Sequence, residues 1–99
     1  MEALDLHAVA RSFPDPWRSR IIGRSGNARI KVLRMDATAH EEEVHGYAEA
    51  LLVLDGRLEL LVGGQHKTVR AGELLMVEAN CSHAVCAGSH GTLLIVDTD

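Results

Sequence analysis

Turn-forming residues recur every eight positions through the second half of this 99-residue chain. Glycine or asparagine stands at Gly56, Gly64, Gly72, Asn80 and Gly88. Short runs rich in Leu and Val fill the intervals, at 50–54, 58–62, 67–70, 74–77, 84–86 and 93–96, and similar runs lie upstream at 20–23 and 29–35. The glycines leave no uninterrupted segment long enough for a helix. Short strands with a turn every eight residues, including one at Asp55-Gly56, predict an all-β antiparallel sandwich or barrel.

The chain is long enough for one domain only, because two halves would each lack the interior needed to fold alone. We expect residues 20–99 to form the barrel and residues 1–19 to be an N-terminal covering segment. Within this segment Asp5 is a candidate cap for a short helix over 6–11, which prolines at 14 and 16 would end. Phe13 and Trp17 are expected to cover an open end of the barrel.

Charge and composition exclude several classes of partner. The net charge is −4, and the chain has one Phe, one Trp and one Tyr, which argues against nucleic acid as a partner. The N-terminus shows no signal peptide or membrane anchor. We therefore expect a cytoplasmic protein with no membrane association, in which Cys81 and Cys86 remain thiols.

Three of the predicted strands are apolar on both faces: 51–54, 60–62 and 93–96. A sheet with one face in water should instead alternate apolar and polar residues. A homodimer joined by sheet packing would cover the second face. The alternative is that Phe13, Trp17 and Ile21 cover it within one chain.

Histidine and carboxylate side chains fall in two groups that a barrel could bring together. Glu43 and His45 are two residues apart, so an extended chain points both to one face, and Glu49 follows four residues later. His83 comes after the tight turn at 78–80. Imidazole nitrogens and carboxylate oxygens converging inside a small barrel would suit a divalent transition metal such as Mn, Fe, Ni or Zn.

The spacing of these residues and glycines resembles the two motifs of the cupin superfamily, from about Arg29 to the C-terminus. The first motif reads Glu43-x-His45-x3-Glu49-x6-Gly56, and the second reads Gly72-x5-Glu78-x-Asn80-x2-His83 with Ala87 at its last position. The resemblance implies a small single-domain cupin, an antiparallel double-stranded β-helix or jelly-roll barrel. In that family three His and one Glu usually hold the metal, which implies His45, Glu49 and His83 as ligands.

The chain departs from the family pattern at four positions. Glu43 replaces the leading His of the first motif, and Glu78, Asn80 and Ala87 replace Pro, Gly and Asn in the second. Asn80 is a mild change, because Asn tolerates the left-handed conformation that a turn glycine supplies.

Three interpretations of the Glu43 replacement remain open. Glu43 is itself the fourth ligand, or His40 swings in from the preceding loop, although its spacing from His45 gives the opposite strand parity. Alternatively, His45, Glu49 and His83 form a hydrogen-bonded cluster without metal.

Two functions from different classes follow. The first is a cupin that binds a divalent metal and a small polar ligand, with Tyr47 as a candidate proton donor because it shares the parity of His45 and Glu49. The second is a metal-free module that binds or senses a small molecule without catalysis.

Overall fold

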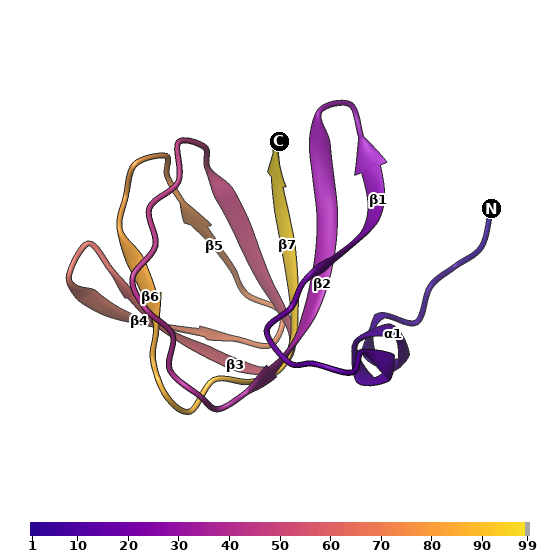
Figure 1. Cartoon of the computed structure of the whole chain (residues 1–99), viewed down its shortest axis with the longest axis horizontal. Coiled ribbons are helices and arrows are strands. Elements are labelled where there is room, and N and C mark those ends of the chain that lie inside the picture. Colours follow the sequence, from indigo (N-terminus) through magenta and orange to yellow (C-terminus); the bar gives the residue numbers. More distant parts are fainter. Residues whose placement is uncertain (99) are drawn as a thin grey trace.

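Seven antiparallel strands and one short helix make up the computed structural model, which describes residues 1–98 (Figure 1). The elements are α1 (Leu6–Ser12), β1 (Arg20–Ser25), β2 (Ala28–Asp36), β3 (Glu49–Val62), β4 (Gln65–Arg70), β5 (Leu74–Val77), β6 (His83–Val85) and β7 (His90–Thr98). The predicted all-β antiparallel architecture is confirmed. Across residues 1–98, no helix has the length and apolar character needed to cross a membrane.

The long strand β3 forms the corner of the barrel. Its first part pairs with β5 and β7, and its last part pairs with β4 and β6. The predicted turn at Asp55-Gly56 is therefore wrong, because the chain continues through this point as one strand with a shift of register against β7. Gly56 has a φ of 76°, and a Cβ there would lie 2.0 Å from the carbonyl oxygen of His90. The glycine thus permits the close approach of β3 to the backbone of β7, just after the register shift between Val53 and Asp55.

The main core fills the inside of the barrel. Its residues are the inward-facing members of β2, β3, β4, β5 and β7: Leu33, Met35, Leu51, Val53, Leu58, Leu60, Val69, Val77, Leu93 and Ile95. Trp17 packs against the edge of this core.

The N-terminal segment begins with the predicted capped helix. The Asp5 side chain accepts a hydrogen bond from the Ala8 N–H at 3.2 Å, which satisfies a backbone donor of the first turn. Phe13 packs with Ala10 and Val32 in a second cluster on the outer face of β2. Phe13 therefore does not cover the open end of the barrel, contrary to the prediction.

Trp17 packs against the main core and connects the N-terminal segment to β2. Its indole N–H donates to Asp36 and its backbone N–H donates to the Arg34 carbonyl, so the segment before β1 is tied to the end of β2. Hydrogen bonds from the Thr38 hydroxyl and from Trp17 lower the pKa of Asp36, which holds this carboxylate in its charged form.

Candidate metal centre

Backbone hydrogen bonds fasten the two histidine-bearing segments together. Glu43 and His83 form an isolated bridge, in which each N–H donates to the other residue's carbonyl, at 2.8 and 3.0 Å. The Asn80 N–H donates to the His45 carbonyl at 2.7 Å, and Asn80 adopts a left-handed φ of 64°, as its place in the tight turn predicts. The segments before β3 and before β6 therefore meet in a fixed register.

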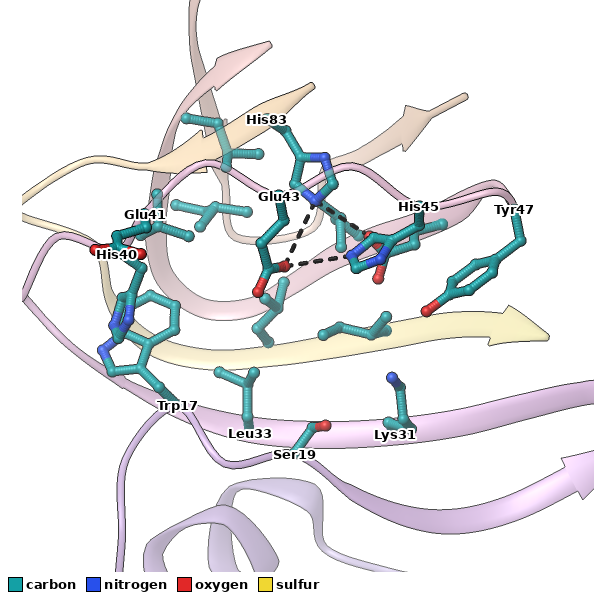
Figure 2. Close-up of a pocket in the computed structure, with 17 residues that line it drawn as sticks. Trp17, Ser19, Lys31, Leu33, His40, Glu41, Glu43, His45, Tyr47 and His83 are labelled. Carbon is teal, nitrogen blue, oxygen red and sulfur yellow. Dashed lines mark hydrogen bonds and ion pairs between the residues drawn. The ribbon is translucent and has the colours of Figure 1, made fainter. Parts of the chain in front are cut away.

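Four side chains converge at this junction (Figure 2). His45 Nε2 lies 3.3 Å from Glu43 Oε2 and 3.5 Å from Glu49 Oε1. His83 Nε2 lies 3.3 Å from Glu49 Oε1 and 4.0 Å from Glu43 Oε2. One ligand atom from each of Glu43, His45 and His83 lies within 4.8 Å of the others.

The tautomer of His83 is set by its backbone neighbour. Its Nδ1 lies 3.2 Å from the Cys81 carbonyl oxygen, which can only accept a hydrogen bond, so Nδ1 carries the proton. In the neutral ring, Nε2 then presents a lone pair toward the Glu49 carboxylate. A carbonyl that holds the second ring nitrogen in this way is typical of metal-binding histidines.

Glu43, His45 and His83 are spaced to hold a small divalent ion, with ligand atoms within 4.8 Å of one another. Ligands about 2.1 Å from a tetrahedral ion lie about 3.4 Å from one another, and the separations between imidazole nitrogens and carboxylate oxygens here run from 3.3 to 4.0 Å. Glu49 contacts both imidazoles but lies outside that group of three. The donor set of two imidazoles and two carboxylates suits Mn, Fe or Zn. Glu49 and His83 are buried, whereas the Glu43 side chain is 65% exposed and stands on the solvent side of the group.

His40 lies apart from the four converging side chains. Its ring packs against Trp17, with centroids 4.4 Å apart, and its Nε2 lies 3.3 Å from the Thr38 hydroxyl. The structure therefore brings Glu43, and not His40, to the position beside His45 and His83.

The converging side chains border a cavity of about 320 Å³ inside the barrel. Tyr47 lines it, and its ring stacks on His45 with a centroid separation of 5.1 Å and an interplanar angle of 9°. No residue among 1–98 hydrogen-bonds the Tyr47 hydroxyl, and Figure 2 shows this hydroxyl turned toward the cavity. Much of the remaining wall is apolar and comes from Leu33, Leu51, Leu58, Leu60, Val85, Leu93 and Ile95.

The sequence reasoning missed Lys31, which also lines the cavity. Its Nζ lies 2.7 Å from Oδ2 of Asp97, whose side chain is fully buried, and Arg29 Nε lies 2.8 Å from Asp97 Oδ1. Burial raises the pKa of Asp97, but hydrogen bonds and charges from Arg29 and Lys31 outweigh it and leave this pKa below its usual value. Strand alternation could have identified Lys31, because Lys31 and Leu33 are two residues apart and therefore point to the same inward face of β2.

The other polar candidates stay outside the site. Both cysteines are free thiols, as predicted, and neither belongs to the group of potential metal ligands. His66 is exposed but paired, with Nε2 2.8 Å from Glu59 Oε2. His90 is exposed at the start of β7. The cytoplasmic location stays a prediction.

Comparison with known proteins places the chain in a family. Residues 32–98 match the family described as Cupin domain. A cupin-2 domain containing protein from Shewanella frigidimarina superposes with a TM-score of 0.87 at 18% identity, over 97% of this chain and 94% of that chain. A cupin superfamily protein from Desulfitobacterium hafniense gives a TM-score of 0.81 at 19% identity, over 98% of this chain and 90% of that chain.

No curated protein matches the sequence significantly. The structural likenesses, at these low identities, concern the fold, and the family match covers most of the strands. The chain thus belongs to the cupin family, and its barrel is the cupin β-barrel that the motif spacing predicted.

Proposed function

We propose that this cupin binds a divalent transition metal through His45, His83, Glu49 and Glu43, and a small polar ligand in the adjoining cavity. The support is the chemistry of the facing atoms. The His83 Nδ1 proton is committed to the Cys81 carbonyl, so a neutral His83 turns a lone pair toward Glu49 Oε1 at only 3.3 Å. Two acceptors at this distance repel unless a cation lies between them.

A metal-free cluster could supply that cation as a proton on each imidazole. The His45 Nε2 atom, however, lies between two carboxylate oxygens, at 3.3 Å from Glu43 and 3.5 Å from Glu49. A His45 N–H directed at Glu43 and a His83 N–H directed at Glu49 would make two separate contacts, whereas one ion held by Glu43, His45 and His83 would contact both imidazoles at once. We therefore propose a metal over two separate protons.

When bound, a divalent ion supplies Lewis-acid polarisation of ligand oxygens. Residues of the chain supply the other functions. The Cys81 carbonyl orients His83, and the apolar cavity walls exclude water from the bound small molecule. The Tyr47 hydroxyl, which faces the cavity beside His45, holds the proton that a reaction would transfer. Tyr47→Phe should then lower turnover of any substrate found while leaving metal binding within about twofold.

Metal titration of chelator-treated protein tests the proposal. At a free metal concentration of about 100 times Kd, binding should stabilise the fold by about 2.7 kcal/mol. For a domain of this size that raises Tm by roughly 10 °C or more. His83→Ala should abolish the rise, and Glu43→Ala should weaken metal binding, whereas His40→Ala should bind metal as the wild type does.

An unchanged Tm with Mn, Fe, Ni and Zn would contradict the metal centre. That result would favour the metal-free alternative, a module that binds or senses a small molecule in the same cavity. A loss of binding in His40→Ala without a loss in Glu43→Ala would contradict the assignment of the fourth ligand.

We further propose that two copies associate through the outer face formed by β2, β7, the first part of β3 and β5. Cross-strand pairing places apolar residues in two rows on this face. One row is Val32, Leu94, Leu52 and Leu74, and the other is Ile30, Val96, Ala50 and Met76. The helix and Phe13 cover the Val32 end, while Leu74 and Met76 are 56% and 52% exposed. Such a continuous apolar face is typical of homodimer interfaces.

Light scattering tests the dimer. The wild type should have a mass near twice 10.7 kDa, and Met76→Glu should shift it toward the monomer. Leu61→Glu is the matched control, because Leu61 is exposed on the part of β3 that pairs with β4 and β6. A monomeric wild type at the concentrations where Met76→Glu is measured would contradict the proposal.

A further inference from the structure

A lysine occupies the inward face of the barrel where the neighbouring positions are apolar. Lys31 pairs across the sheet with Ile95, which pairs in turn with Leu51, and both of these residues belong to the core. The Lys31 side chain is only 15% exposed. A nearly buried ammonium is costly unless partners surround it.

Protein partners satisfy this ammonium only in part. Lys31 contacts Asp97 Oδ2 at 2.7 Å, and within residues 1–98 no second acceptor contacts its Nζ. An ammonium has three N–H donors, so two of them remain for the cavity. Asp97 also holds Arg29 through both oxygens, at 2.8 and 3.1 Å, so it does not serve Lys31 alone.

The cavity around Lys31 is suited to a small amphiphile. Figure 2 shows the Lys31 ammonium and the Tyr47 hydroxyl both turned toward the cavity, with Ser19 beside Lys31. Leucines form much of the remaining wall. The volume of about 320 Å³ lies at the small end of the range for small-molecule pockets, which suits a small ligand.

We propose that the cavity binds a small organic acid, with its carboxylate on Lys31 and Tyr47 and its apolar body against the leucines. One ammonium and one hydroxyl match a single carboxylate, whereas phosphate sites commonly gather several cations or a helix N-terminus. The inference rests on the proposed metal centre. Without an ion, Glu43 and Glu49 place two negative charges on the same cavity and repel an acid; a divalent ion neutralises them.

Butyrate is a suitable probe, because it has one carboxylate, a short apolar body and little tendency to extract metal. Zinc binding to each protein is measured first by calorimetry. Butyrate is then titrated into the zinc-loaded protein, with the fluorescence of Trp17 as the readout. Trp17 is the chain's single tryptophan and lines the cavity. Butanamide, which has the same shape without the charge, and inorganic phosphate are titrated in parallel.

Lys31→Met should bind butyrate at least about tenfold more weakly than the wild type, the loss expected for one charge-assisted hydrogen bond. Arg29→Met is the matched control, because Arg29 contacts the same Asp97 but does not line the cavity. It should bind butyrate within about threefold of the wild type. Lys31→Gln, which keeps a polar group, serves if Lys31→Met does not fold.

Zinc binding should be unchanged in all three variants, and butanamide should bind at least tenfold more weakly than butyrate. Equal butyrate affinity in the wild type and the Lys31 variants would overturn the acid site while leaving the metal centre intact. Tighter binding of phosphate than butyrate would overturn the assignment to carboxylates. If the wild type binds none of Zn, Mn, Fe and Ni, which is measured before any acid is added, both proposals are overturned.

Discussion

Replacing Asp97 with Asn removes the charge that neutralises two nearly buried cations. The Asp97 side chain is fully buried, and those of Arg29 and Lys31 are 22% and 15% exposed. Removing one partner of a buried ion pair costs about 3–5 kcal/mol. The lower end applies here, because both cations have flexible stems that can move their charges toward solvent. We therefore expect Asp97→Asn to lose about 3 kcal/mol at pH 7, or roughly 12–24 °C in Tm.

The pH dependence of this loss has a definite sign. The Asp97 pKa in the folded protein lies below its ordinary value of 3.8, because the contributions of Arg29 and Lys31 exceed that of burial. A lowered pKa in the folded state means that the carboxylate stabilises the fold fully above the unfolded pKa. This stabilisation is lost as the pH falls through the folded pKa. The stability difference between wild type and Asp97→Asn should be constant above about pH 5 and shrink below about pH 4.

Urea denaturation of both proteins, followed by circular dichroism from pH 3 to pH 8, measures the difference directly. Ser25→Ala, in an exposed position at the end of β1, is the control for effects of mutation and purification that are unrelated to the ion pair. It should change the free energy of unfolding by less than about 0.5 kcal/mol. A difference below about 1 kcal/mol at pH 7 would refute the reasoning. So would a difference that grows as the pH falls.

Two further substitutions test the packing. Gly56→Ala should lower the free energy of unfolding by about 3 kcal/mol or more in urea denaturation, because its Cβ would lie 2.0 Å from the His90 carbonyl oxygen. Gly26→Ala is the control: Gly26 has a similar φ, but a Cβ there would meet no other atom, so this variant should lose about 1 kcal/mol. Ser89→Ala should lose about 1–3 kcal/mol of thermal stability, since the fully buried Ser89 hydroxyl accepts from the Glu59 N–H at 2.8 Å. Equal losses in both glycine variants, or an unchanged Tm in Ser89→Ala, would contradict these contacts.

The spacing of turn residues predicted most strands correctly because strand ends are local features. Gly64, Gly72 and Asn80 mark turns in the structure as they do in the sequence. Gly56 was misread, because a close approach of two strands and a hairpin turn both select glycine, the first for the missing Cβ and the second for the positive φ. Only the pairing of β3 with β7 on both sides of Gly56 distinguishes the two. This pairing depends on residues more than thirty positions away.

The site was predictable to the extent that it follows spacing along the chain. The motif spacing selected His45, Glu49 and His83, and the structure brings these side chains together. The place of Glu43 remained open because it depends on a backbone bridge to His83, which is forty residues later. Lys31 was missed for a related reason. Its buried position depends on the contact with Asp97, which the register of β2 and β7 places beside it.

A crystal structure of the metal-loaded protein tests the central claim most directly. With Mn or Zn added and data collected at the metal's absorption edge, the account predicts one anomalous peak in each chain. The peak should lie about 2.0–2.2 Å from the Nε2 atoms of His45 and His83 and from carboxylate oxygens of Glu49 and Glu43. An absence of anomalous density between the two imidazoles, in crystals grown with excess metal, would contradict the account.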